Sequence, residues 1–147
     1  MSRFPNATVA EYGTYSYYTG GFGLVANKIK AEIFARGPVA ASINADPLLD
    51  YEGGVVNNTS VWSMMPNHIV SIVGWGTSRE SGQQYWIVRN SWGEYWGNMG
   101  YFNILMGHNS LGIESEVSAV HSFSRLCIVS KAVLALGGLG NPREFHH

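Results

Sequence analysis

The sequence is poor in cysteine, in charged residues and in long apolar runs. Its 147 residues include a single cysteine, Cys127, so no internal disulfide can form. Only 13% of the residues are charged, and nine Lys and Arg against ten Asp and Glu leave a net charge of -1. Proteins that bind a phosphate backbone carry a basic face or stripe. The composition therefore excludes nucleic acid as an expected partner.

No apolar stretch reaches the roughly 18 to 20 residues that span a bilayer. Behind Arg3 there is also no apolar run, so we expect no signal peptide in this chain. The five histidines have no metal-ligand spacing with cysteine, and the G-x-S-x-G elbow of serine hydrolases is absent. We expect no metal, no cofactor and no membrane partner.

Apolar residues, by contrast, are plentiful. Of all residues 46% are hydrophobic and 13% aromatic, which is enough for one buried core. One segment has helical periodicity: Val25, Ile29 and Ile33 recur every four residues within 24–36. The following Gly-Pro pair ends this predicted helix, because proline has no N–H to donate.

Most of the remaining order is predicted to be β-structure. Residues 68–76 and 85–90 are β-branched and aromatic, and the polar residues 77–83 between them predict a hairpin connection. Further extended pieces are expected within 39–45, 51–56 and 100–105. The sequence thus predicts an α+β fold, a mainly antiparallel sheet with one packed helix.

Changes in composition predict three segments along the chain. Residues 1–22 are rich in Tyr and Gly and predict an extended, turn-rich N-terminal segment rather than a helix. Residues 23–120 carry the periodic elements and form the expected globular lobe. Residues 121–147 contain a Gly-rich run without periodicity, which predicts a disordered or foreign tail.

His68 and Asn90 carry the clearest chemistry in the sequence. If the hairpin is centred near Arg79, His68 lies directly opposite Asn90 and both side chains share one face of the sheet. An amide oxygen beside an imidazole accepts one ring N–H, which fixes the tautomer and leaves the other nitrogen to serve a nucleophile. By spacing alone, a purely structural role for both residues stays open.

The residues around this pair resemble papain-like cysteine peptidases. NHIVSIVGWG at 67–76 resembles the histidine strand of that family, and YWIVRNSWG at 85–93 resembles its asparagine segment. Supporting matches occur at 96–97, 100–102, 9–13, 31–39, 51–54 and 111–115. Within the family, these segments are most similar to the cathepsin X type, also called cathepsin Z. Residues 9 to about 120 resemble the C-terminal right-hand lobe, an antiparallel β half-barrel.

The resemblance implies roles for five side chains. His68 would be the proton-transferring base, Asn90 would orient it, and Trp92 would shield their hydrogen bond from water. Ile69 and Ser42 fall where the family lines its substrate cleft. The complete enzyme would hydrolyse peptide bonds of peptide or protein substrates through a thioester, in lysosomes or outside the cell.

The nucleophile of the family has no counterpart in this sequence. In the family it lies in a Cys-Gly-Ser-Cys-Trp-like segment ahead of the histidine, on a helical lobe. Cys127 instead follows both His68 and Asn90. We therefore expect a fragment of such a peptidase, inactive alone, whose natural partner is the N-terminal helical lobe.

Two other interpretations and one modification signal stay open. A lobe without a nucleophile would still bind a peptide or an inhibitor without catalysis. The run GFGLVA at 21–26, with Asp46 downstream, fits a dinucleotide motif, but the Tyr-rich residues before it lack the apolar run of a central parallel strand. N-glycosylation motifs begin at Asn6, Asn57 and Asn58, and they have meaning only in the secretory pathway.

Overall fold

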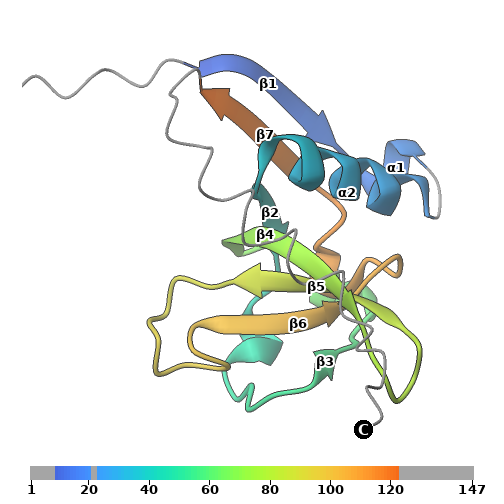
Figure 1. Cartoon of the computed structure of the whole chain (residues 1–147). Coiled ribbons are helices and arrows are strands. Elements are labelled where there is room, and N and C mark those ends of the chain that lie inside the picture. The colour runs from blue at the N-terminus through green and yellow to red at the C-terminus, as the bar shows by residue number, and fades with distance from the viewer. Residues whose placement is uncertain (1–8, 21–22, 123–147) are drawn as a thin grey trace, which may run out of the picture.

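A computed structural model describes residues 9–20 and 23–122, and in them one sheet of seven strands packs with one long helix (Figure 1). The helix is α2, Leu24–Arg36, and a single turn, α1, precedes it at Tyr17–Gly20. The strands are β1 Val9–Tyr15, β2 Val39–Ile43, β3 Val55–Val56, β4 His68–Thr77, β5 Gln84–Arg89, β6 Tyr101–Leu105 and β7 Val117–Ser122. Three short 3-10 helices are η1 Asp46–Leu48, η2 Val61–Met64 and η3 Ser110–Gly112.

The strand order in the sheet is β1-β7-β2-β4-β5-β6-β3, with every neighbouring pair antiparallel except β3 and β6. This confirms the predicted α+β class and its mainly antiparallel sheet. β1 and β7 lie beside α2 in one half of the molecule, and β4, β5 and β6 form the other half (Figure 1). β2 joins the halves because it pairs with both β7 and β4.

Helix α2 forms where the four-residue periodicity predicts it. Val25, Ile29 and Ile33 are buried on the face toward the sheet. The helix ends because Gly37, at a φ of 111° that favours glycine, donates its N–H to the Ile33 carbonyl and Pro38 follows. The residues of the four-residue repeat are thus the same residues that the helix buries against the sheet.

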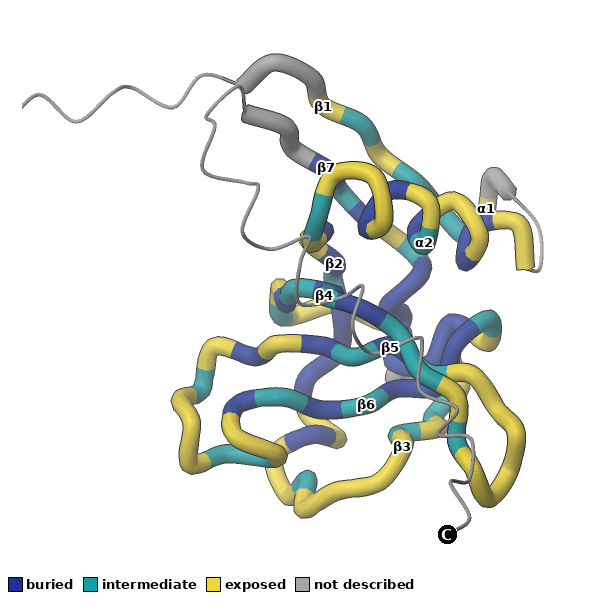
Figure 2. The backbone as a smooth tube through the Cα atoms, viewed as in Figure 1, coloured by how far each residue is buried: buried dark blue, intermediate teal, exposed yellow. Residues whose placement is uncertain are grey.

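The core contains buried side chains from α2 and from the strands β2, β4, β5, β6 and β7. Figure 2 shows buried positions along these elements in dark blue. β5 and β6 alternate between buried and less buried positions, as strands with one covered face do. Trp86 and Phe102 are the largest fully buried side chains, and Ile72, Val88 and Ile104 surround them in the same core cluster. Three neighbouring strands therefore share one core, which holds the end of β4 and the end of β5 in fixed positions.

Two elements differ from the sequence prediction. Tyr17–Gly20 is helical, and the Tyr18 N–H donates to Ser16 Oγ at its start while the Tyr17 N–H donates to the Glu114 carbonyl. β7 was not predicted, because Val117 and its neighbours form only a short, weakly apolar run. It becomes a strand by pairing with both β1 and β2, partners far away in the sequence.

The division into 1–22, 23–120 and 121–147 stays a prediction. Residues 9–15 belong to the sheet as β1, and β7 extends to Ser122. Residues 123–147, including Cys127, lie outside the described residues. Within the described part of the chain, no helix has the length and apolarity required to cross a membrane.

The sheet contradicts the dinucleotide interpretation. That motif requires two adjacent parallel strands joined by the helix. β1 and β2 flank α2 in sequence, but antiparallel β7 lies between them in the sheet. Gly21 and Phe22 lie outside the described residues, and Asp46 starts the 3-10 helix η1.

Candidate active site

The structure brings His68 and Asn90 together. His68 is the first residue of β4, and Asn90 follows the last residue of β5. The His68 Nε2 atom lies 2.9 Å from Asn90 Oδ1. Asn90 is 7% exposed, so this contact lies at the edge of the core.

The predicted direct opposition of the two residues is wrong, although their proximity is not. The β4–β5 ladder ends at the pair Ser71 and Arg89, and it contains a shift between Ile72 and Gly74. In the sheet, His68 pairs with Ile43 of β2. The pair Thr77 and Gln84 centres the loop between Glu80 and Ser81 rather than near Arg79, and spacing alone reveals neither this centre nor the bulge.

Asn90 reaches His68 from a turn rather than from a strand. Its backbone N–H donates to the Gly100 carbonyl over 2.9 Å, which fixes the chain just beyond β5. From that position its side chain contacts His68, the first residue of β4. The amide therefore approaches His68 although the ladder between the two strands has already ended.

A second contact of Asn90 fixes the tautomer of His68. The Ser91 backbone N–H donates to Asn90 Oδ1 over 2.8 Å. Because a backbone N–H can only donate, this atom is the amide oxygen and not the nitrogen. His68 Nε2 must then carry a proton to complete its bond to the same oxygen. In the neutral imidazole Nδ1 then keeps its lone pair, and this is the arrangement that a general base requires.

Trp92 covers this hydrogen bond. Its ring centroid lies 5.3 Å from that of the His68 imidazole, with the planes tilted by 32°. Trp96 packs edge-on against Trp92 at 5.0 Å and donates its Nε1–H to the Leu48 carbonyl. The structure places Trp92 beside His68, and its shielding role stays a prediction. Trp96 holds Trp92 in place, a contact that the matching pair at 96–97 did not by itself indicate.

Leucine at position 92 should therefore increase the solvent exchange of the His68 Nε2–H proton. We expect roughly fivefold faster exchange, the change that corresponds to about 1 kcal/mol weaker protection. Proton–nitrogen NMR spectra of the histidine ring measure it directly. The matched control is Trp62→Leu, because it removes the same type of side chain at a position that is 83% exposed. Equal exchange in both variants would contradict a shielding role.

Ile69 and Ser42 are cross-strand partners on β4 and β2. Ser42 lines a groove and is next in sequence to Ile43, the strand partner of His68, whereas Ile69 is 67% exposed and does not line the groove. Of these two predicted cleft residues, the structure places only Ser42 in the groove. Directly opposed residues point to the same face of a sheet, so Ile69 still extends from the face that Ser42 occupies.

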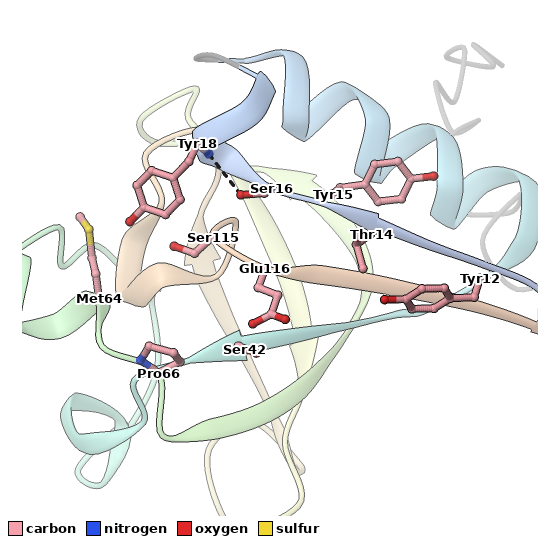
Figure 3. A pocket seen from close by; sticks show the side chains of 10 residues that line it. All are labelled: Tyr12, Thr14, Tyr15, Ser16, Tyr18, Ser42, Met64, Pro66, Ser115 and Glu116. Carbon is pink, nitrogen blue, oxygen red and sulfur yellow. Dashed lines mark hydrogen bonds between the residues drawn. The ribbon is translucent and has the colours of Figure 1, made fainter.

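The groove encloses about 620 Å³ and lies between β1, β2 and the segments before β4 and β7 (Figure 3). Its lining residues are Tyr12, Thr14, Tyr15, Ser16, Tyr18, Ser42, Met64, Pro66, Ser115 and Glu116. The Glu116 carboxylate extends into its centre, above Ser42 (Figure 3). Residues 111–115 resemble the family, but the sequence predicts no role for Glu116, because a single residue beyond a motif carries no local signal.

Glu114 anchors the wall of this groove from the inside. This residue is 1% exposed, and its carboxylate accepts the Trp86 Nε1–H over 2.8 Å, the Gly107 N–H over 2.7 Å and the Asn109 N–H over 3.1 Å. Partial burial, then the Glu114 charge and Tyr18, raise the pKa of Tyr17 beside it. Three donors around one carboxylate fix the path of residues 106–116, and with it the position of Glu116.

No metal centre is found in residues 9–20 and 23–122, because no three His, Cys, Asp or Glu side chains gather there. The only hydrogen bond of the His68 ring in this part of the chain is the one to Asn90. The site therefore consists of an oriented imidazole, its amide partner and the stacked ring of Trp92, and a groove that contains Glu116 begins at Ser42, next to the strand partner of His68.

Comparison with known proteins gives the same family repeatedly. The family model described as papain family cysteine protease matches residues 5–121. The gut-specific cysteine proteinase of Caenorhabditis elegans is 44% identical over 95 residues, which are 64% of this chain and 28% of the relative. The viral cathepsin of Heliothis zea nuclear polyhedrosis virus is 36% identical over 93 residues, 63% of this chain and 24% of the relative.

Solved structures agree. The digestive procathepsin L2 proteinase from Tenebrio molitor larval midgut matches with a TM-score of 0.64 and 35% identity, covering 76% of this chain and 34% of that one. The digestive procathepsin L 3 of the same source matches with a TM-score of 0.64 and 34% identity, covering 77% and 35%. The chain thus spans about a quarter of the curated relatives it matches and about a third of these structures.

Proposed function

Because the chain belongs to the papain family of cysteine proteases, we propose that His68 and Asn90 are the proton-transferring half of a peptide-hydrolysing site. The observation that carries this proposal is the paired contact of Asn90 Oδ1, which accepts from His68 Nε2 and from the Ser91 N–H. It leaves His68 Nδ1 as the basic nitrogen, on the side away from Asn90.

The reaction that this arrangement supports has two steps, the formation of a thioester and its hydrolysis. Nδ1 takes the proton of a cysteine thiol, and the thiolate attacks the peptide carbonyl to form a tetrahedral intermediate. The resulting imidazolium protonates the leaving amine, and a thioester remains. His68 then takes a proton from water, which attacks the thioester. The carbon–sulfur bond breaks, the acid is released, and the departing thiolate takes the proton back from the imidazolium. Asn90 keeps the ring in place through both halves.

The cysteine itself is proposed to come from a helical lobe that meets the His68 end of the sheet. Large apolar side chains are exposed near this end: Trp62 at 83%, Met65 at 65% and Ile69 at 67%. Burial of such a patch is favourable at about 25 cal/mol per Å² of apolar surface. Contact with a second lobe would cover these residues and place a thiol beside Nδ1.

The test is complementation. The chain alone should not hydrolyse a fluorogenic peptide, whereas its covalent fusion behind the nucleophile-bearing lobe of a papain-family peptidase should do so. A thiol-directed inhibitor should block that turnover. A fusion that folds, binds the inhibitor through its cysteine and still hydrolyses nothing would contradict the proposed role of His68 and Asn90.

A finer proposal concerns the subtype and the place of action. The residues of the matched segments support a cathepsin X-like carboxypeptidase. The relatives named above support the family and not this subtype. The similarity to a viral cathepsin and to a digestive procathepsin supports a lysosomal or secreted location. Comparing peptides with free and amidated C-termini in the fusion tests the subtype, because a carboxypeptidase requires the free carboxylate.

Glu116 should determine which side chain the groove accepts. Its carboxylate extends into the groove beside Ser42, so a basic substrate side chain would be complemented there. In the fusion enzyme, Glu116→Gln should lower kcat/KM about fivefold for peptides with Arg or Lys at the residue in the groove, the equivalent of ~1 kcal/mol. Peptides with Leu or Phe there should be unaffected.

The matched control for this variant is Glu80→Gln. Glu80 is also exposed, but it lies in the hairpin between β4 and β5, at the opposite end of β4 from His68. The substitution Glu80→Gln removes the same charge from the protein, and Glu80 does not line the groove. A loss of the same size for basic and apolar peptides, or the same loss in both variants, would contradict the assignment of Glu116.

A noncatalytic lobe that binds a peptide or an inhibitor is the second candidate. The observation that favours it is that the groove is formed by this chain alone, without any nucleophile. Binding of a peptide to the isolated chain, measured by calorimetry, together with an inactive fusion would favour this candidate over the first.

A further inference from the structure

We propose that Asn57 is an N-glycosylation site and that its neighbour Asn58 is not. Two overlapping motifs occur here, Asn57-Asn58-Thr59 and Asn58-Thr59-Ser60. The sequence treats them as equivalent, because each has a hydroxyl residue two positions after the asparagine. The folded structure distinguishes them.

Asn57 is available on the surface. It follows β3, the outermost strand of the sheet next to β6, and its side chain is exposed. Thr59, the hydroxyl residue of its motif, is exposed too. A glycan on the Asn57 amide would extend into solvent beside the edge of the sheet, where a polar cover also hinders pairing with another chain.

Asn58 is held on both its backbone and its side chain. Its N–H donates to Ser110 Oγ over 2.8 Å, and its carbonyl accepts the Leu111 N–H over 2.9 Å. Its side-chain Oδ1 accepts the Ser60 N–H over 3.2 Å, and the residue is half-buried. Ser110 and Leu111 are themselves completely buried. A glycan at Asn58 would have to displace contacts that connect this loop to the core.

The transfer balances without any change in oxidation state. The donor is an oligosaccharide linked to a lipid through a diphosphate, on the lumenal side of the secretory pathway. Asn57 Nδ2 forms a bond to the first sugar carbon while the bond from that carbon to the diphosphate oxygen breaks. The lipid diphosphate leaves with the electron pair, and one amide proton passes to solvent.

Two variants separate the motifs without altering either asparagine. Thr59→Ala removes the motif of Asn57 and keeps that of Asn58, since Ser60 remains. Ser60→Ala removes the motif of Asn58 and keeps that of Asn57. Both are made in an Asn6→Gln background, so that residues 57–60 contain the only remaining motifs.

The full 147-residue chain is expressed behind an added secretion signal in insect cells, and the glycan is removed with an enzyme that converts the modified asparagine to aspartate. Mass spectrometry then locates the converted residue. The parent and Ser60→Ala should carry one glycan at Asn57, and Thr59→Ala should carry none. Retention of the glycan by Thr59→Ala, two glycans in the parent, or none in the parent would each overturn the proposal.

If little protein is secreted, the glycan is located in the same way on protein purified from the cells. The added signal makes the result independent of the proposed location and of peptidase activity. Failure of this proposal is therefore distinguishable from failure of the proposed function.

Discussion

Alanine at His68 should lower kcat/KM for peptide hydrolysis by ~10²–10⁴-fold in the complemented enzyme, the range that a positioned general acid–base group contributes. The same imidazole activates the thiol, protonates the leaving amine and activates water, so its loss affects both halves of the reaction. Steady-state kinetics with a fluorogenic peptide measure the effect. Binding of substrate in the groove should change little, because Ser42 and Glu116 remain.

Two further variants make this prediction specific. His108→Ala removes an exposed histidine outside the site and should leave kcat/KM unchanged. Asn90→Ala should have a smaller effect than His68→Ala, because it removes the partner that orients the ring and leaves the base present. Substantial activity in His68→Ala, or an equal loss in His108→Ala, would exclude His68 as the base.

Alanine at Glu114 should destabilise the fold by ~3–5 kcal/mol, because it leaves two buried donors and one half-buried donor without their acceptor. These are the Trp86 Nε1–H and the backbone N–H groups of Gly107 and Asn109. Water entering the space of the lost side chain would offset only part of this cost. Single domains are stable by only about 5–15 kcal/mol, so a large part of the total is lost.

Urea unfolding followed by tryptophan fluorescence measures this change as a lower midpoint with a similar slope. Glu116→Ala is the matched control, since it removes a carboxylate two residues away that is exposed and should alter stability by less than about 0.5 kcal/mol. Trp86→Phe removes one of the three donors and should restore part of the loss when combined with Glu114→Ala. Equal midpoints for the two glutamate variants would show that the buried carboxylate is not stabilising.

The sequence could predict those parts whose cause is local. Helix α2 is specified by apolar residues at four-residue steps and by the Gly-Pro pair at its end, so its predicted range 24–36 agrees with the structure. β4 and β5 were found within a residue or two of their observed ends, because continuous β-branched and aromatic runs with a polar loop between them have few alternatives.

The parts that failed depend on distant partners. β7 has little apolar character of its own and is a strand because β1 and β2 both pair with it. The loop between β4 and β5 is centred between Glu80 and Ser81, as the pair Thr77 and Gln84 shows, and not near Arg79, which made the predicted opposition of His68 and Asn90 wrong. Glu114 lies in the matched segment 111–115, but its structural role gave no signal in the sequence, because a carboxylate surrounded by donors from residues 86, 107 and 109 exists only after folding.

By itself, the sequence determined the family, the helix, the hairpin and the identity of the histidine–asparagine pair, since each follows from residue types at short spacing. Only the tertiary structure decided the atoms in contact, the tautomer of His68, the aromatic cover from Trp92 and Trp96, and the groove with Glu116 at its centre. Short-range patterns limit the backbone to a few local conformations. Hydrogen-bond geometry and burial depend on residues far apart in the chain, and no local pattern encodes them.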